Sequence, residues 1–409
     1  MGRYVNPGNE GFASIVSDEY VDKTGLITLF DSTLNKPRKL VMVSRPRRFG
    51  KSFAAQSISA FYSCGCDSRS LFEGLEVSRR EGWDQNLNAY NVLSLDMAEV
   101  MQAAAGDGTV EAVAKAVLPE LRVLAPGAGS GAASRESEVA SALWDAVKAT
   151  GRKFVFVIDE WDAPYRLAQG DRAAQDAYAE WLRALFKSNT LTPVVVAGAY
   201  MTGILPIKKY AHQSAVSDFD EYTMVDPAQY APYAGFTQED VDALCAEHGL
   251  DAADARRWYD GYDLPTFDQR TGEPCHVSVY APYSVMRACA RRRAGSYWPS
   301  TETFEELRRY IDMDFEGLQA DVLRAIGGEE LRVNTARFQN DMASVASRDD
   351  ALTLLVHLGY LCYDRATGRA RVPNEEVRGE LRRAASRSRH PRLAQVMRDS
   401  IQLVADVLA

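Results

Sequence analysis

Short apolar runs separated by helix-like patterns dominate the first half of the chain. The runs occupy residues 40–43 (LVMV), 91–96 (NVLSLD), 154–158 (FVFVI) and 193–199 (PVVVAGA). Their length and bounding polar residues predict buried strands, and five apolar residues in succession at 154–158 are typical of a parallel sheet covered on both faces. Helical patterns lie at 26–30, 53–61, 98–124, 138–150 and 178–188. The alternation predicts an α/β fold.

The first apolar run leads into a short basic loop, SRPRRFGKS at residues 44–52, and then into a helical pattern. Because a helix N-terminus presents unpaired N–H groups, phosphate oxygens can bind there, with Lys51 adding charge and Ser52 a hydroxyl for Mg²⁺. The candidate nucleotide contacts are Arg45, Pro46, Arg47, Phe49, Gly50, Lys51, Ser52 and Phe53. The pattern GxxxxGK[ST] has glycine where this chain has Arg45, so the loop by itself is also compatible with a basic turn that contains GKS by chance.

Acidic residues follow the run at 154–158, in the sequence FVFVIDEWD. The C-terminal ends of the strands are where open α/β sheets bind ligands. Phosphoryl transfer needs a carboxylate for Mg²⁺, here Asp159, and a group that orients the attacking water, here Glu160. Taken singly, the acids could cap a turn, and Asp162 could begin a helix. Together with GKS upstream they favour nucleotide hydrolysis.

Two more polar residues stand at predicted strand ends. Thr202 follows the run at 193–199 and is a candidate for sensing the γ-phosphate, although its hydroxyl could equally satisfy the turn before Gly203. Asp96 is the last residue of the run at 91–96 and could face the nucleotide, but strand-end carboxylates are more often caps.

Composition narrows the class of protein. The chain has 409 residues, 46% of them hydrophobic, so it can bury large cores and is expected to form two or three domains. A net charge of −9 argues against a bulk nucleic-acid coat protein. The six scattered cysteines have no histidine spacing that would complete a zinc site. No signal peptide opens the chain and no apolar run is long enough for a membrane span, so we expect a cytoplasmic protein without membrane contact.

The C-terminal part has a different pattern. A helix over residues 352–358 is followed by a strand, a turn at 364–368 and a return strand, which is typical of a winged helix. Such a module can bind DNA or can pack domains, and we favour packing or oligomer contact. A basic helix at 378–398 could touch nucleic acid, but charge runs are usually solvated. Arg256 and Arg257 could reach phosphates, although a solvated helix end is the simpler interpretation.

Seven segments together carry a resemblance to a known family. They are YVDKT (20–24), SRPRRFGKS (44–52), VIDEWDAPY (157–165), TGILPI (202–207), WYDGY (258–262), VYAPYSV (279–285) and VPNEEVR (372–378). As a set spread over almost the whole chain, they resemble the bacterial AAA-ATPase-like family, whose members often carry a C-terminal PD-(D/E)xK nuclease-like domain. In that family an arginine-rich loop in place of the first glycine is usual. The chain departs from the family in having Trp161 for a frequent tyrosine and Ala281 for a frequent asparagine.

The resemblance implies a parallel-sheet P-loop NTPase core with an additional strand, followed by a helical lid and a winged-helix-like α+β region. We expect the core at residues 1–225, the lid at 226–300 and the last region at 301–409. A nuclease site is not expected in this chain, because its last lysine is Lys209 and no ExK motif can follow. The chain ends about where the nuclease-like domain of the family begins, so we expect either a natural short form or a truncated one.

The sequence therefore predicts a protein that binds ATP and hydrolyses it with Mg²⁺, as a conformational or assembly switch. Lys51 and the loop amides would hold the phosphates, Ser52 and Asp159 the Mg²⁺, and Glu160 the water. Arg48 or a neighbouring loop arginine would neutralise charge in the transition state. The alternatives are a nucleotide-gated binding module with little hydrolysis, and a DNA-binding protein with an accessory ATPase core. A homo-oligomer and a nucleic-acid contact through the C-terminal region are left open.

Overall fold

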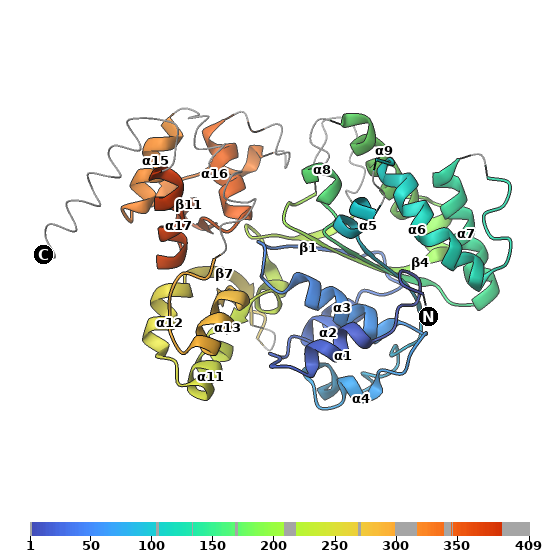
Figure 1. Ribbon diagram of the computed structural model, residues 1–409, viewed down its shortest axis with the longest axis horizontal. Coiled ribbons are helices and arrows are strands. Elements are labelled where there is room, and N and C mark those ends of the chain that lie inside the picture. Colours follow the sequence, from blue (N-terminus) through green and yellow to red (C-terminus); the bar gives the residue numbers. More distant parts are fainter. Residues whose placement is uncertain are drawn as a thin grey trace, which may run out of the picture. The chain divides into compact units, whose positions relative to one another are not determined.

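The computed structural model of the chain (Figure 1) describes residues 2–103, 106–132, 134–167, 171–207, 218–268, 271–298, 317–338, 345 and 347–386. The chain forms two compact units. The first comprises Met1–Ser44 and Gly50–Tyr222, and the second comprises Arg45–Phe49 and Thr223–Ala409. Residues Arg45–Phe49 of the basic loop therefore belong, by their contacts, to the second unit, whereas Ser44 and the GKS residues belong to the first. The predicted three-part division at residues 225 and 300 stays a prediction.

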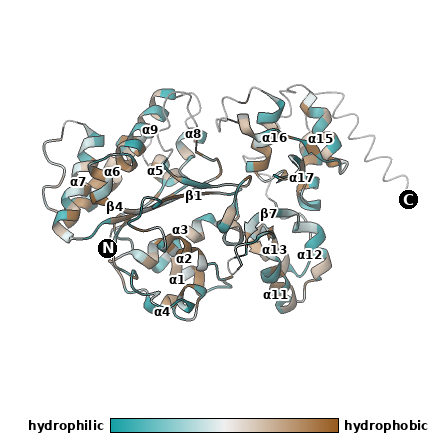
Figure 2. Ribbon diagram, turned by 180° about the vertical axis from the view of Figure 1, so that it is seen from behind, coloured by the Kyte–Doolittle hydropathy of each residue, from teal (hydrophilic) through white to brown (hydrophobic). Residues whose placement is uncertain are grey.

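A five-stranded parallel sheet forms the centre of the first unit. Its strands are β1 (Leu40–Ser44), β2 (Asn91–Asp96), β3 (Phe154–Asp159), β4 (Val196–Gly203) and β5 (Asp220–Tyr222). They are ordered β2-β3-β4-β1-β5, so β4 lies between the strand before the basic loop and the strand that ends in the acids. This arrangement confirms the predicted parallel sheet with an additional strand. In Figure 2 the ribbon around β4 has the brown colour of hydrophobic residues, as buried strands require.

Helices cover both faces of this sheet (Figure 1). On one side lie the helices that precede and follow the basic loop, and on the other lie those between β2 and β4. The first group is α1 (Glu10–Val16), α2 (Gly25–Asp31), α3 (Lys51–Tyr62), α4 (Arg69–Phe72) and the 3₁₀ turn η1 (Glu76–Arg79). The second group is α5 (Met97–Ala103), α6 (Thr109–Leu124), α7 (Arg135–Thr150), α8 (Ala163–Leu167), α9 (Arg172–Phe186) and α10 (Leu191–Val195).

Two predicted elements of this unit have different boundaries. The strand expected at 193–199 begins only at Val196 and continues to Gly203, because residues 191–195 form a helical turn in which Thr192 donates its hydroxyl hydrogen bond to the Leu185 carbonyl. The single helix expected at 98–124 is two helices, α5 and α6. The chain between them contains Gly106 with φ of +100°, a conformation that a helix cannot include.

The N-terminal motif YVDKT organises a turn in the first unit. The carboxylate of Asp22 accepts hydrogen bonds from the backbone N–H of Thr24 at 2.8 Å and of Glu76 at 2.6 Å. The hydroxyl of Thr24 accepts a further one from Val77 at 3.1 Å. These bonds satisfy N–H groups at the start of η1, so the motif joins two segments that are distant in sequence.

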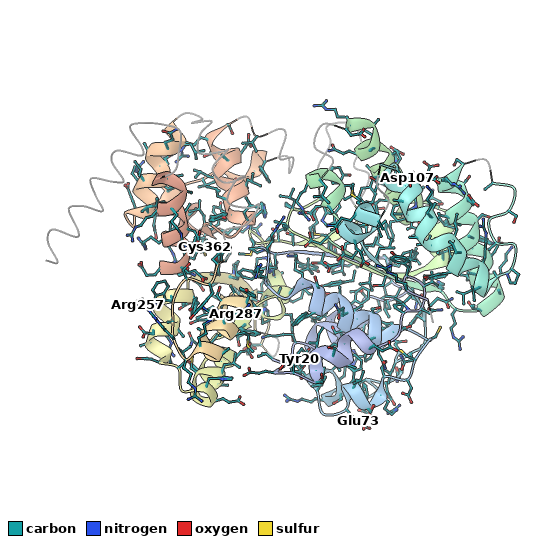
Figure 3. The ribbon with its side chains drawn as sticks, viewed as in Figure 1. Tyr20, Glu73, Asp107, Arg257, Arg287 and Cys362 are labelled. Atoms are coloured by element: carbon teal, nitrogen blue, oxygen red, sulfur yellow. The ribbon has the colours of Figure 1, made fainter. Side chains whose placement is uncertain are left out.

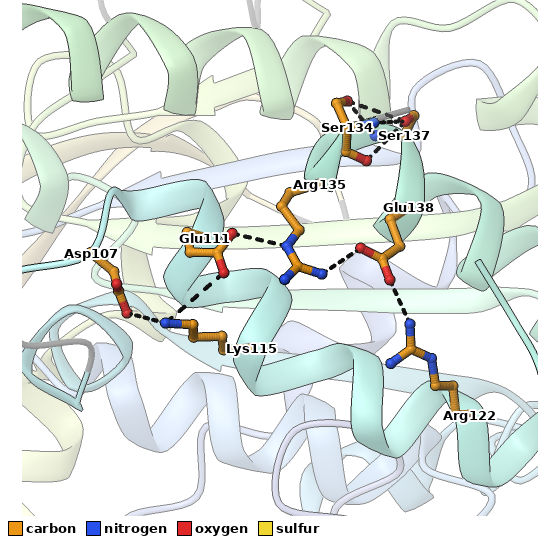
Figure 4. Close-up of polar contacts among 8 residues, drawn as sticks. All are labelled: Asp107, Glu111, Lys115, Arg122, Ser134, Arg135, Ser137 and Glu138. Carbon is orange, nitrogen blue, oxygen red and sulfur yellow. Dashed lines mark hydrogen bonds and ion pairs between the residues drawn. The ribbon is translucent and has the colours of Figure 1, made fainter. Parts of the chain in front are cut away.

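An ion-pair network on the surface links α6 and α7 (Figure 4). Arg135 bridges Glu111 at 3.0 Å and Glu138 at 2.6 Å, and Lys115 pairs with Asp107 at 2.7 Å. At the start of α7, Ser134 and a serine three residues later form a capping box. Because these charges are exposed, we expect the ion pairs to contribute little to the free energy of unfolding of the unit. Their main effect would be on how α6 and α7 align with each other.

The second unit begins with a group of helices, as expected for the helical lid that the resemblance implied, together with a small antiparallel sheet. Its helices are η2 (Ala228–Tyr233), α11 (Gln238–His248), α12 (Ala252–Tyr259) and α13 (Pro282–Arg291). Between them, β6 (Phe236–Thr237), β7 (Tyr262–Phe267) and β8 (Pro274–Tyr280) form an antiparallel sheet in the order β6-β8-β7. The small sheet is additional to the helices that were expected in this region. Pro265 obscures β7 in the sequence, and proline is tolerated because β7 is an edge strand.

The remaining part of the second unit follows the predicted winged-helix-like pattern. Its elements are α15 (Leu318–Ile326), β9 (Leu331–Arg332), η4 (Thr335–Arg337), α16 (Arg348–His357), β10 (Cys362–Asp364), β11 (Arg369–Arg371) and α17 (Glu375–Ser386). The antiparallel strands are ordered β10-β11-β9. Residues 351–358, which include most of α16, are buried, so this helix has little free surface for a nucleic-acid groove. The predicted basic helix is described only as far as Ser386, and residues 387–398 lie outside the described residues.

Three family motifs meet inside the second unit. Gly261 of WYDGY has φ of +116°, and a Cβ atom there would lie 2.0 Å from the carbonyl oxygen of Pro373, in VPNEEVR. From the same motif, Glu376 accepts hydrogen bonds from the backbone N–H of Tyr297 at 2.6 Å and of Trp298 at 2.8 Å. Ser284, in VYAPYSV, also bonds to this carboxylate. These motifs therefore hold the second unit together.

We expect the stability of the protein to fall as the pH rises through neutrality, because of Glu376. Burial raises the pKa of Glu376 to about 7, the charge of Glu380 adds to the shift, and hydrogen bonds from Ser284, Tyr297 and Trp298 oppose it. Since the unfolded carboxyl titrates near its ordinary value, the folded protein binds more protons between about pH 4.5 and 7. The stabilising contribution is complete below about pH 4.5 and is lost as the pH rises through about 7.

Thermal unfolding of Glu376→Gln between pH 5 and 8 tests this expectation. Glutamine is neutral and can still accept the two backbone hydrogen bonds, so the variant should lose part of the decline in midpoint that the wild type shows. The matched control is Glu375→Gln on the same turn, whose carboxylate pairs with Arg378 at 3.2 Å, and its pH profile should follow the wild type. An unchanged profile in Glu376→Gln would contradict the assignment.

Among the described helices, none combines the length and the apolar character that a bilayer crossing needs.

Candidate functional site

The basic loop joins β1 to the first turn of α3, as the sequence predicted. Gly50 stands at the N-cap of α3 with φ of +83°, a left-handed conformation that favours glycine. Apart from Gly50 itself and its neighbours along the chain, no atom of the described residues lies within 4 Å of the position that a Cβ of Gly50 would occupy. Phe53, in the first turn of α3, has 54% of its surface exposed. The helix N-terminus is thus preceded by an open glycine, which is the arrangement that lets phosphate approach backbone N–H groups.

Lys51 lies within the field of three carboxylates at the end of β3. The residue is only 6% exposed, and this burial lowers the pKa of Lys51. The charges of Glu160, Asp159 and Asp162 oppose the shift, and that of Arg166 adds to it. The structure therefore brings the lysine of the loop and the acids of the second motif into one electrostatic cluster.

Ser52 and Asp159 are in direct contact. Their side chains form a hydrogen bond, which together with the charge of Lys51 favours the ionised carboxylate, while burial is the larger effect and raises the pKa of Asp159 to about 6. A hydroxyl oxygen and a carboxylate oxygen are the hard ligands that Mg²⁺ prefers, and the ion usually keeps several waters beside such protein ligands. The two predicted metal ligands therefore fit Mg²⁺.

Asp96 lies beside Asp159 in the sheet, because β2 and β3 are paired in register at these two residues. Its carboxylate accepts hydrogen bonds from the backbone N–H of Ala98 at 2.9 Å and of Glu99 at 3.1 Å. Burial raises the pKa of Asp96, against those bonds and the charge of Arg166. Asp96 is thus a helix cap for α5, as its simpler interpretation held, and also adds negative charge next to Asp159.

Thr202 is the penultimate residue of β4, the strand between the loop and the acids. Its side chain is buried, and its Oγ1 has no hydrogen-bond partner among the described residues. Next to it, a Cβ on Gly203 would come within 2.6 Å of Trp161 and 2.7 Å of Asp162, so only glycine fits. Trp161 in turn donates its indole N–H to the carbonyl of Leu205 at 3.1 Å. The motifs VIDEWDAPY and TGILPI therefore pack against each other.

Arg166 is a site residue that the sequence analysis missed. Its guanidinium donates a hydrogen bond to Oε2 of Glu160, and its Nε lies 3.2 Å from Oδ2 of Asp162. Asp162 stands directly before α8, and its carbonyl accepts the backbone N–H groups of Tyr165 at 3.0 Å and Arg166 at 3.1 Å, as at a helix start. Its carboxylate accepts the backbone N–H groups of Ile204 at 3.2 Å and Leu205 at 3.0 Å, at the exit of β4. The spacing Asp162-x₃-Arg166 puts both residues on one helix face, which is the signal that could have revealed the pair.

The arginines of the loop contact the second unit. Arg45, in the position of the missing glycine, is fully buried and donates a hydrogen bond to the carbonyl of Tyr230 at 3.3 Å. Phe49 packs edge-on against Tyr262 with 5.3 Å between ring centroids. Pro46 is also buried, while Arg47 is half-buried and Arg48 is exposed. The side chain of Arg45 is therefore held by contacts within the second unit.

Arg48 lies over an aromatic ring of the same unit. Its guanidinium is 4.1 Å from the ring centroid of Tyr283, and that of Arg287 is 5.3 Å from the same ring. Hydrogen bonds from Arg287 and Arg48 lower the pKa of Tyr283. Arg287 on α13 is labelled in Figure 3, as is Arg257. Arg256 pairs with Asp242 and Arg257 with Asp254, both in exposed positions, as expected for a solvated helix end.

Ala281, where the family often has asparagine, is the N-cap of α13 and makes no capping bond with its side chain. Asparagine is among the best N-cap residues, which explains the family preference at this position.

A parallel sheet with an additional strand, a basic GKS loop and two acids at the end of β3 define a P-loop NTPase core. Residues 8–211 match the sequence profile of the AAA-ATPase-like family, described as "Predicted AAA-ATPase". The N-terminal half of the chain thus belongs to this family, which confirms the resemblance seen in the sequence. A relative from Azotobacter chroococcum, an uncharacterized protein in the 5′ region of vnfD, is 27% identical over 423 residues, which cover 98% of this chain and 73% of the relative.

Solved structures with a similar fold have low identity to this chain. One is the ORC2 protein of Aeropyrum pernix with ADPNP and ADP, at 12% identity and a TM-score of 0.44, covering 95% of this chain and 98% of that one. Another is the Walker-type ATPase PABY2304 of Pyrococcus abyssi, at 14% identity and a TM-score of 0.40, covering 88% and 94%. The family assignment above does not depend on these two similarities.

Proposed function

We propose that the protein binds ATP at the N-terminus of α3 and hydrolyses it with Mg²⁺, using the cycle as a conformational or assembly switch. Lys51 and the N–H groups after Gly50 hold the phosphates, and Ser52 with Asp159 holds the metal ion. Bound Mg²⁺ would neutralise phosphate charge. Glu160 orients the water, and the free hydroxyl of Thr202 is a hydrogen-bond donor for the γ-phosphate.

The observation that best supports this proposal is the cluster of Ser52, Asp159, Glu160 and Lys51. A buried lysine, a hydroxyl bonded to a strand-end carboxylate and a second acid on the next residue are the groups that phosphoryl transfer requires. A structural ion pair alone would not need the hydroxyl or the open glycine at the helix start. Adenine is preferred to guanine because Asn35-Lys36 continues as Pro37-Arg38 and no NKxD motif is present.

Titration calorimetry with ATP, run beside a phosphate-release assay with and without Mg²⁺, tests the function. We expect binding in the micromolar range and release that depends on Mg²⁺. Tight binding without release would favour the nucleotide-gated binding module. No binding of ATP, or equal release in the presence of a metal chelator, would contradict the proposal.

Duplex DNA in the same assays separates the remaining alternative. A DNA-binding protein with an accessory ATPase core would bind duplex DNA with a steep salt dependence and would release phosphate faster in its presence. The burial of α16 argues against this outcome, and we expect no DNA-dependent change in either assay.

A further inference from the structure

The carboxylate of Glu160 is connected to the end of β4 through two other side chains. Arg166 donates a hydrogen bond to Glu160 and pairs with Asp162. Asp162 is fixed in turn by the backbone N–H groups of Ile204 and Leu205, immediately after β4. The chain of contacts thus runs from the strand that carries Thr202, through Asp162 and Arg166, to the acid that orients water in the proposed reaction.

The burial of these side chains shows that the contact is more than a surface ion pair. The side chain of Arg166 is 6% exposed, that of Asp162 is 1% exposed, and that of Glu160 is 22% exposed. The planar guanidinium of Arg166 donates a directed hydrogen bond to Glu160 and forms an ion pair with Asp162, a geometry that a lysine reproduces only in part. Glu160 is the most exposed of the three side chains, and its contact with the buried Arg166 therefore fixes its position.

The backbone supports the same conclusion. Glu160 has φ of +51°, and its N–H donates a hydrogen bond to Oδ1 of Asp159 at 2.9 Å. The backbone of Glu160 is therefore fixed beside the proposed metal ligand, but the side chain of Glu160 still has three rotatable bonds. The hydrogen bond from Arg166 restricts them, which matters because catalysis depends on the position of the base to within about 1 Å.

We propose that Arg166 is a positioning residue that fixes the carboxylate of Glu160 for the activation of water, and that Asp162 fixes Arg166. The inference rests on the proposed ATP hydrolysis and names an additional group that it requires. Arg166 acts through Glu160 and takes no part in holding the adenine or the metal ion. It follows that Arg166 affects turnover and leaves nucleotide binding nearly unchanged.

Steady-state hydrolysis and calorimetry of Arg166→Ala and Arg166→Lys test this role. In Arg166→Ala we expect kcat to fall by about 10- to 100-fold, while KM and the Kd for ATP stay within about threefold of the wild type. Arg166→Lys should restore part of kcat. The matched control is Arg183→Ala, whose arginine pairs with Glu180 at 3.3 Å on the exposed side of α9 and should leave every parameter unchanged.

A double-mutant cycle with Glu160→Gln separates positioning from a general loss of structure. If Arg166 acts through Glu160, adding Arg166→Ala to Glu160→Gln should change the residual rate by less than about twofold. Thermal unfolding, with and without Mg-ATP, reports on folding and binding in each variant. If Arg166→Ala does not fold, Asp162→Asn keeps the arginine and should lower kcat by a smaller factor.

Three results would overturn the inference: an unchanged or raised kcat in folded Arg166→Ala, a loss of ATP binding in it, or a full additional loss of rate in the double variant. A wild type that binds ATP but releases no phosphate would instead contradict the proposed hydrolysis, so the two failures can be distinguished.

Discussion

Replacing Glu160 by glutamine is expected to lower the rate of ATP hydrolysis by at least about 100-fold, because a positioned general base contributes roughly 10²- to 10⁴-fold. Glutamine has nearly the same shape and can still accept a hydrogen bond from Arg166, but it cannot take a proton from water. ATP binding should therefore stay within about threefold of the wild type. Phosphate release under saturating ATP and Mg²⁺, beside calorimetry, measures both quantities. Normal turnover in this variant would refute the mechanism.

Lys51→Ala is the matched variant for this experiment. Its lysine is buried beside the acids, and its removal takes away one of the positive charges near Asp159 and Glu160. We expect this variant to lose ATP binding and hydrolysis together, whereas Glu160→Gln loses only hydrolysis. The same loss of binding in both variants would mean that Glu160 holds the nucleotide rather than the water.

Gly261→Ala is expected to have the largest effect on stability, with a loss of about 3 kcal/mol or more from backbone strain and overpacking together. At φ of +116° an L-residue is strained, and its Cβ would lie 2.0 Å from the carbonyl oxygen of Pro373, which is backbone and cannot move alone. Because both segments lie in the second unit, the unfolding transition of that unit should shift to lower temperature in a calorimetric scan.

Gly368→Ala is the control variant that measures the cost of a positive φ without a steric clash. Gly368 also has positive φ, +66°, in the turn between β10 and β11, but no atom lies within 4 Å of a Cβ built there. We expect a loss of about 1 kcal/mol, typical of replacing glycine in a left-handed conformation. Equal losses at both positions would show that the close approach of Pro373 contributes nothing.

The parts of the fold that depend on hydrophobic pattern could be predicted from the sequence. The run NVLSLD gives β2 with the expected boundaries. The run FVFVID gives β3, because a parallel strand that is buried on both faces is continuously apolar. The meeting of the acids with the GKS loop also follows, since the C-terminal ends of parallel strands lie on one edge of a sheet. The hydrogen bond of Ser52 to Asp159 is the result of that topology.

Features that depend on tertiary contacts could not be predicted in the same way. The hairpin of β7 and β8 was missed because its edge strand carries Pro265 and lacks a clean apolar alternation. Arg166 looks like an ordinary surface charge until Asp162 is known to bind the exit of β4. Likewise, nothing in SRPRRFGKS distinguishes the buried Arg45 from the exposed Arg48, because what buries one of them is Tyr230, 185 positions away.

The basic loop contains residues of both compact units, and this has a thermodynamic consequence. Residues Arg45–Phe49 are continuous with β1 and α3 of the first unit, yet their contacts place them in the second. A nucleotide bound at Lys51 and a ligand of the second unit would therefore act on one stretch of backbone. Linkage requires that the factor by which such a ligand changes nucleotide affinity equals the factor by which the nucleotide changes affinity for that ligand. If the second unit binds such a ligand, measuring how strongly ATP changes its affinity for that ligand would thus also give the effect of the ligand on the affinity for ATP.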